Sequence, residues 1–278
     1  FINNYYNQSS LSAIIGMNSA IVYNYNGILV GSLTEFDRYS GYWVLMDEQE
    51  INSFSGYLTD YSLQYSLSSG ANLISFPSSL SYPLEDALPE SLEGVVTAII
   101  SEGDVALYDS DYDEWYGALT SFEGFKGYWF ITNQAVDFSF DLTTGGFTRN
   151  TYRTKEMLQG YEYNQSTLQS FYFIKDISIA EEGDWIIAYN DDVVVGAREW
   201  SGYMTDIPVM GDDGADYSLG YIENDQCPEF KLYQVSTGKL VDLYSEDQMP
   251  CFSNNTIPVL SKLNDTKMSV PKSVVLKG

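Results

Sequence analysis

The chain of 278 residues contains no histidine, and this absence removes the commonest catalytic machinery. Ser-His-Asp and Cys-His nucleophile pairs need an imidazole as general base, and zinc enzymes usually need histidine ligands. A glycosidase needs only two carboxylates about 5–10 Å apart. The 39 acidic residues therefore leave that hydrolase class open, but no pair of them stands out. We expect a protein that is not an enzyme.

Basic residues are scarce as well, with 13 Lys and Arg against 39 Asp and Glu and a formal net charge of −26. Binding to nucleic acid or to an anionic membrane surface needs Lys and Arg to displace counterions, so both partners are excluded. No apolar run approaches the roughly 18–20 residues that span a bilayer, so we predict no membrane insertion. The partners left open are neutral molecules, cations and metal ions.

Cysteine is limited to Cys227 and Cys251. A disulfide between them would close a loop of about 25 residues, worth roughly 3 kcal/mol in the chain-entropy model. The alternative is a pair of free, buried thiols. A metal site would need more ligands than this pair offers, and no histidine can add to it. We predict the disulfide.

A repeat organises the first half of the chain. A phrase recurs about 86 residues apart, as Gly31–Phe36 with Gly41-Tyr42-Trp43 and as Gly117–Phe122 with Gly127-Tyr128-Trp129. Alignment of residues 13–15 with 98–100 extends the match to a whole module. The second copy opens earlier, with the segments 61–67 and 72–77, and the first copy has no room for this opening. We therefore expect the chain to be a processed or truncated product, or to begin with a module that lacks its first strands.

Short segments rich in Tyr, Ile and Val alternate with Gly, Asn, Asp and Ser, a pattern typical of many short strands joined by turns. Only residues 84–92, which follow Pro83 and have apolar residues at helical spacing, predict a short helix. The sequence thus predicts an all-β chain of tandem β-sandwich-like modules. The predicted domains are an incomplete first repeat (1–60), a second repeat (61–144), a C-terminal β-sandwich module (151–260) and a tail (261–278). A polar stretch over 143–150 is the predicted linker.

Three pieces of the chain resemble a known family. They are the opening Asn72–Pro77 with its closing Lys126–Trp129, the series Gly183–Asn190, Val195–Ala197 and Gly211–Asp213, and the segment Ser269–Leu276. These pieces resemble β-modules of secreted bacterial surface proteins that carry sorting domains of the type IX secretion kind. The resemblance covers most of the chain, although the first copy has Ser40 where the second has Lys126. It implies a non-catalytic structural or adhesive protein, located outside the cell or on the bacterial surface.

The tryptophans of the repeat allow two interpretations. Trp43 and Trp129, together with Trp115, are candidate platforms on which sugar rings could stack. Alternatively, the first two fill the ends of their own modules, because they occupy the same repeat position and are followed by apolar Val44 or Phe130. The second interpretation is the one that the pattern favours.

Two acidic groups suggest Ca²⁺, the only cofactor that the sequence indicates. The stretch 109–114 spaces carboxylates two apart but lacks the Gly and distal Glu of an EF-hand, which favours a solvated hairpin tip. The stronger candidate surrounds Gly214 and consists of Asp212, Asp213, Asp216 and Asp191. The alternative is a polar loop in which Asp side chains accept hydrogen bonds from turn amides.

Two functions follow as hypotheses. In the first, the protein assembles with itself, in the extreme into a filament, because a sheet that lacks its opening strands exposes an edge that a strand donated by another copy would cover. The Val-rich segment 269–276 is the candidate donor. In the second, the modules bind carbohydrate through exposed Trp and Tyr side chains, with acidic loops holding Ca²⁺.

Overall fold

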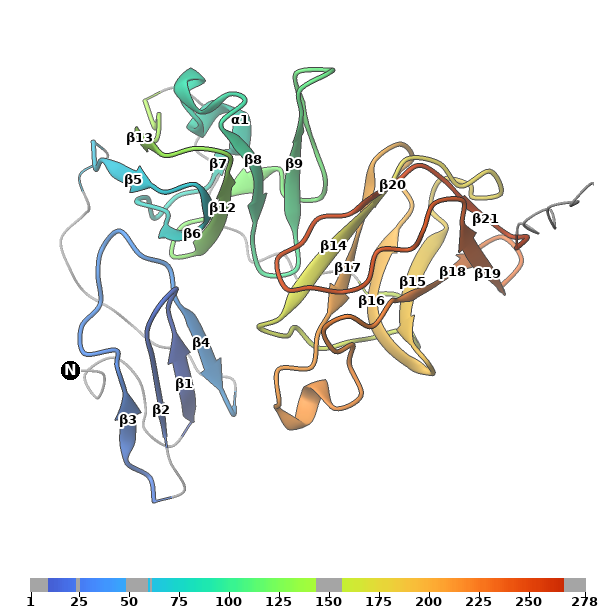
Figure 1. Cartoon of the computed structure of the whole chain (residues 1–278), viewed down its shortest axis with the longest axis horizontal. Helices are drawn as coiled ribbons and strands as arrows, with labels where there is room; N and C mark the ends of the chain where they lie inside the picture. The colour runs from blue at the N-terminus through green and yellow to red at the C-terminus, as the bar shows by residue number, and fades with distance from the viewer. Residues whose placement is uncertain (1–9, 24–25, 49–59, 61, 144–156, 268–278) are drawn as a thin grey trace, which may run out of the picture. The chain divides into compact units, whose positions relative to one another are not determined.

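The computed structural model describes residues 10–23, 26–48, 60, 62–143 and 157–267 (Figure 1). The chain divides into two compact units, Phe1–Arg153 and Thr154–Gly278, which are described separately. The regular structure is almost entirely β-strand, which confirms the predicted all-β class. Among the described residues, no helix has the length and apolarity needed to cross a membrane.

The first repeat forms one antiparallel sheet in the strand order β3-β2-β1-β4. Its strands are β1 (Leu11–Ile15), β2 (Ala20–Tyr23), β3 (Leu29–Gly31) and β4 (Trp43–Met46). One face of the sheet covers a small core whose buried members are Leu11, Ile14 and Leu33. Side chains of neighbouring residues in a strand point to opposite faces, so every second residue of β4 contacts this core.

The second repeat contains a five-stranded antiparallel sheet in the order β10-β9-β8-β12-β6, together with the two-stranded sheets β11-β7 and β13-β5. The strands are β5 (Tyr65–Leu67), β6 (Gly70–Ser75), β7 (Tyr82–Pro83), β8 (Val96–Ile100), β9 (Val105–Asp109), β10 (Glu114–Tyr116), β11 (Ser121–Phe122), β12 (Gly127–Thr132) and β13 (Val136–Phe138). The acidic stretch 109–114 is the hairpin between β9 and β10, where the sequence placed a hairpin tip.

Aromatic rings dominate the core of the second repeat. Phe76, Phe122, Tyr128 and Phe140 contact one another with ring centroids 4.9–6.5 Å apart, mostly edge to face. The hydrophobic core to which these rings belong contains nineteen buried residues, whereas the core in the described part of the first repeat contains three. Edge-to-face pairs add to the stability that burial of the rings provides. Among the described residues, the second repeat therefore has a far larger core than the first.

The predicted helix over 84–92 is wrong in its length. Helix α1 covers only Leu84–Ala87, and a separate 3-10 turn covers Glu90–Leu92. Between them, Leu88 has an extended backbone because the ring of Pro89 disfavours a helical conformation in the preceding residue.

The repeated phrase closes each module in the same way. The hydroxyl of Tyr42 accepts a hydrogen bond from Asp37 N at 2.8 Å, and the hydroxyl of Tyr128 accepts one from Glu123 N at 2.6 Å. Each tyrosine ring also meets a phenylalanine of its phrase edge to face, at 5.0 Å in the first copy and 4.9 Å in the second. The repeat seen in the sequence is thus a repeat of contacts.

The second unit is a β-sandwich of a three-stranded sheet (β17-β14-β20) and a five-stranded sheet (β16-β15-β18-β19-β21), with one hydrophobic core between them. The strands are β14 (Gln169–Ile174), β15 (Trp185–Asn190), β16 (Val193–Glu199), β17 (Thr205–Met210), β18 (Glu229–Gln234), β19 (Lys239–Ser245), β20 (Val259–Leu260) and β21 (Leu263–Asn264). A 3-10 turn covers Asp216–Ser218. Cys227 and Cys251 form a disulfide within this unit.

Residues of the resemblance in this unit serve the fold. A Cβ atom on Gly196 would lie 1.7 Å from the carbonyl oxygen of Pro208, so only glycine lets β16 and β17 approach this closely. Asp184 is 4% exposed, and its carboxylate accepts hydrogen bonds from the backbone N–H groups of Glu181 and Val235. Both residues therefore position strands.

The C-terminal boundary of the sandwich was predicted too early. Strand β21 pairs with β19, and Leu263 is fully buried, so the module continues past residue 260 to at least Asn264. The predicted tail over 261–278 therefore includes a strand of the sandwich. Residues 144–150 of the predicted linker and the predicted donor segment 269–276 lie outside the described residues.

Candidate functional site

The tryptophans of the two repeats point away from the module cores. In β12, Tyr128 and Phe130 are buried in the aromatic core, whereas Trp129 between them lies on the opposite face and is only partly buried. In β4, Val44 contacts the core and Trp43 does not. The interpretation that each tryptophan fills its own module is wrong, because the preceding tyrosine occupies the core position and strand alternation turns the tryptophan outward.

Both tryptophans occupy the same place on their outer faces. Trp43 is the cross-strand partner of Ile15 on β1, and Trp129 is the partner of Ile100 on β8. Each tryptophan is therefore paired with an isoleucine, and Ile100 beside Trp129 is fully buried.

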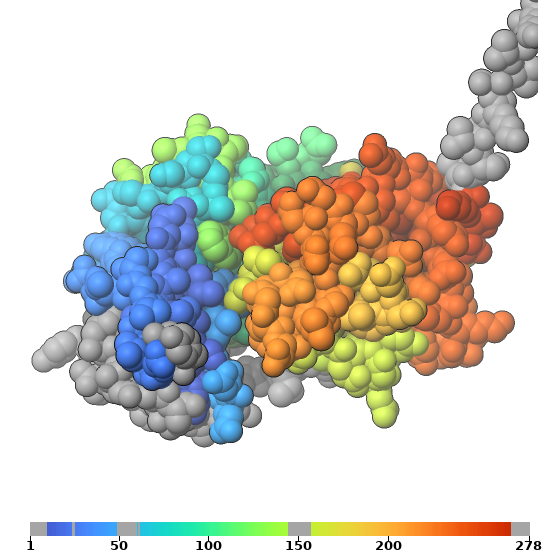
Figure 2. Space-filling model, turned by 60° about the horizontal axis from the view of Figure 1, so that its bottom comes forward, coloured from blue at the N-terminus to red at the C-terminus, as the bar shows by residue number. Residues whose placement is uncertain are grey.

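The first repeat (blue in Figure 2) lies against the opening of the second repeat (cyan), and a bridge joins Ser40, which precedes the closing Gly41, to Ile74. Gly41 N donates a hydrogen bond to Leu73 O at 3.2 Å, and Ser75 N donates to Tyr39 O at 3.0 Å. A Cβ atom on Gly127 would lie 2.8 Å from Gly41 Cα, closer than a real side chain comes to backbone. Glycine at both equivalent positions lets the two phrases touch.

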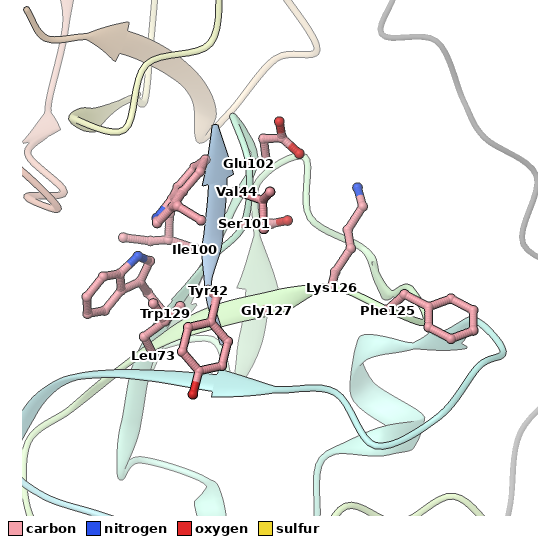
Figure 3. Close-up of a pocket in the computed structure, with 11 residues that line it drawn as sticks. Tyr42, Val44, Leu73, Ile100, Ser101, Glu102, Phe125, Lys126, Gly127 and Trp129 are labelled. Carbon is pink, nitrogen blue, oxygen red and sulfur yellow. The ribbon is translucent and has the colours of Figure 1, made fainter. Parts of the chain in front are cut away.

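This contact creates a cavity of about 210 Å³ that is lined by both tryptophans, Leu73 and Ile100, with Glu102 and Lys126 also in its wall (Figure 3). A second cavity of about 360 Å³ adjoins it and shares Tyr42, Val44 and Phe125. We call the two cavities together the inter-repeat groove. It combines apolar aromatic walls with a few polar groups, which is the usual composition of a small-molecule site.

Phe125 is the most unusual residue of the groove, and the sequence reasoning missed it. Its side chain is 85% exposed, and its backbone has a φ of 65°, a conformation that costs energy in residues other than glycine. Figure 3 shows Phe125 beside Lys126, at the other end of the lining residues from Trp129. The equivalent Tyr39 packs against Tyr65 at 5.8 Å. The available signal was a phenylalanine in a turn, between Gly124 and Lys126.

The groove is close to electrically neutral in a chain of net charge −26. Its basic residues are Arg38 and Lys126, and its acidic residues are Asp37 and Glu102. Lys126 also forms an ion pair with Glu123 at 3.0 Å. This balance favours a neutral ligand.

Trp115 does not join the other two tryptophans. It lies on β10 beside Tyr108, with ring centroids 5.2 Å apart, and lines a separate cavity of about 400 Å³. That cavity also contains the side chains of Glu85, Glu93 and Glu114. The structure therefore pairs two of the three candidate stacking residues and leaves the third elsewhere.

Asp213, a predicted calcium ligand, is surrounded by donors from its own chain. Its carboxylate accepts hydrogen bonds from Thr167 N and Oγ1, the Tyr217 hydroxyl, Ala215 N and Ser218 Oγ at 2.6–3.2 Å. Burial alone would raise the pKa of Asp213, but these hydrogen bonds, led by that of Tyr217, lower it to about 2. The loop is organised around this carboxylate.

The other predicted calcium ligands are spread over two turns. Asp212 accepts hydrogen bonds from Gly214 N and Ser218 Oγ. Asp216 begins the 3-10 turn and Asp191 lies in the turn between β15 and β16, both exposed to solvent. Among the residues that the structure describes, no three His, Cys, Asp or Glu side chains are grouped so that they could hold a metal ion. The observed hydrogen bonds are those of the polar-loop alternative.

Comparison of the chain with protein-family models, with curated proteins and with solved structures gave no match. The resemblance to secreted bacterial surface proteins stays a prediction.

Proposed function

We propose that this protein is a non-catalytic, extracellular adhesive protein that binds glycans in the inter-repeat groove. One observation carries the proposal. Trp43 and Trp129 come from equivalent positions of two repeats, face away from both cores, and line one cavity. Pyranose rings present flat C–H faces that pack on aromatic rings, while their hydroxyl groups bond to polar groups at the rim.

The remaining walls of the groove suit the same ligand. Phe125 supplies a further exposed ring, and Lys126, Glu102 and Arg38 supply donors and acceptors for sugar hydroxyls. The near balance of charge favours a neutral glycan over an anionic one. The disulfide supports an extracellular location, because such bonds persist mainly in oxidising compartments.

The test begins with the full chain on a glycan array, followed by calorimetric titration of the best neutral oligosaccharide. The variants Trp43→Ala and Trp129→Ala should each lower the affinity about tenfold or more, because each removes a stacking surface from the same cavity. Trp115→Ala is the matched control, since it deletes the same side chain from a different cavity. It should bind as tightly as the unchanged protein.

Two results would overturn the proposal. One is an array without neutral hits. The other is wild-type affinity in both groove variants while their circular dichroism spectra show an intact fold. Repeating the titration with a chelator tests the calcium hypothesis separately. Loss of glycan binding in the presence of the chelator would show that a metal ion is needed, which the groove residues alone do not account for.

A further inference from the structure

Among the described residues, strand β4 has an unpaired edge at which its counterpart in the second repeat is paired. Strand β12 lies between β8 and β6, whereas β4 pairs with β1 alone among the described strands. In the second repeat, Phe76 N donates to Lys126 O at 3.1 Å and Tyr128 pairs with Ile74. The backbone N–H and C=O groups of even-numbered residues of β12 therefore face β6. The equivalent residues in the first repeat are Tyr42, which precedes β4, and Val44 and Met46 within it.

The opposite edge of this segment is already used. Gly41 N bonds to Leu73 O, and residues of β4 pair with β1 from Trp43 onward. Within the described part of the chain, the backbone N–H and C=O groups of Tyr42, Val44 and Met46 pair with no strand. We call these backbone groups the acceptor edge.

The acceptor edge lacks the usual protection against pairing. Natural edge strands carry Lys, Pro, bulges or inward charges that block a second chain. Strand β4 reads Trp-Val-Leu-Met, without charge and without proline. The core below it is also small, with three buried residues among those described. A strand added at this edge would form hydrogen bonds with the backbone groups of the acceptor edge. Its side chains would also enlarge that core.

We propose that the acceptor edge binds the segment 268–278 of a second copy of this chain, so that copies assemble by strand donation. Because Tyr42 and Val44 also line the inter-repeat groove, a bound segment would lie beside the proposed glycan site. The segment has eleven residues, and β6, which fills the same place in the second repeat, has six. It contains Val270, Val274, Val275 and Leu276, residues that favour strands. As the new outermost strand, it would tolerate Pro271.

Charge favours the same occupant. The segment contains Lys272 and Lys277 and no acidic residue, in a chain of net charge −26. Asp47 and Glu48 directly follow β4 and are exposed. Opposite charges near the acceptor edge would attract the segment and make the assembly weaker at high salt.

The first experiment measures mass by light scattering over a range of protein concentrations, for the full chain and for a variant that lacks residues 268–278. This deletion leaves β21 and the buried Leu263 in place, whereas deletion from residue 261 would remove them. The full chain should form oligomers whose mass rises with concentration, and the shortened chain should stay monomeric. A full chain that is monomeric at every concentration, or a shortened chain that assembles equally well, overturns the proposal.

The second experiment titrates a fluorescent peptide of residues 268–278 into the shortened chain and follows anisotropy. An added strand uses only every second amide in pairing, so two peptides with N-methyl groups on alternate amides should differ, one binding and one not. A scrambled peptide of the same composition controls for charge alone and should not bind. Equal binding of the scrambled peptide, or equal behaviour of the two methylated peptides, contradicts strand donation.

Discussion

At the scale of single residues, Asp213 has the clearest consequence for solution behaviour. Its pKa is about 2 in the folded protein, below the ordinary value of 3.8, because five hydrogen bonds favour the ionised carboxylate. A group with a lowered pKa stabilises the fold above its ordinary pKa, and this contribution is lost as the pH falls. We expect the second unit to lose stability between about pH 4 and pH 2.

The variant Asp213→Asn tests this expectation. It leaves donors around the carboxylate without an ionised acceptor, so the free energy of unfolding at pH 7 should fall by about 2 kcal/mol. Urea unfolding at pH 7, 4, 3 and 2 should show the difference between the two proteins shrinking as the pH falls. Asp216→Asn is the control, because that side chain is exposed. A difference that stays constant with pH would contradict the assignment.

Residue type alone did not decide which aromatic of the Gly-Tyr-Trp phrase is buried. Both Tyr128 and Trp129 are large and apolar, and the strand alternates them between two faces. The hydroxyl of Tyr128 finds a backbone donor in Glu123 N, which makes its burial favourable. That partner lies in a loop whose path the sequence does not reveal, so the sequence analysis assigned both tryptophans to the wrong face of their strands.

At the scale of secondary-structure elements, the contact of the two repeats depends on a pair of glycines. An alanine at 127 would place its Cβ 2.8 Å from Gly41 Cα, and both atoms belong to paired backbone that cannot move freely. Gly127→Ala should therefore lower the free energy of unfolding of the first unit by about 1–3 kcal/mol, as overpacking does. Urea unfolding followed by tryptophan fluorescence measures it.

Lys126→Ala serves as the matched control for stability. Lys126 precedes Gly127 and its side chain is exposed, and surface ion pairs such as the one with Glu123 contribute at most about 1 kcal/mol. If Gly127→Ala were as stable as this control, the repeats would not need the close approach. The groove geometry would then have to form in another way.

Elements with strong alternation were predictable, and those shaped by contacts between segments were not. Strand β18 (Glu229–Gln234) is of the predictable kind, because Phe230 and Leu232 alternate with polar residues and are buried. The pattern over 84–92 was misread since Pro89 interrupts its helical spacing. Prediction of the loop around Asp213 would have required the position of Thr167, which lies 46 residues earlier in the chain. Sequence spacing carries no information on such a partner.

At the scale of the whole molecule, the division into two units predicts how a reductant acts. Cys227 and Cys251 both belong to the second unit and lie 24 residues apart, so their disulfide restricts only that part of the unfolded chain. Reduction should cost the second unit about 3 kcal/mol of stability and leave the first unit unchanged. Hydrogen exchange followed by mass spectrometry, with and without reductant, reports peptides of each unit separately.

The double variant Cys227→Ser/Cys251→Ser should reproduce the behaviour of the reduced protein without any reagent. Faster exchange in both units to the same extent would mean that they unfold together, and the two-unit description would then fail for stability.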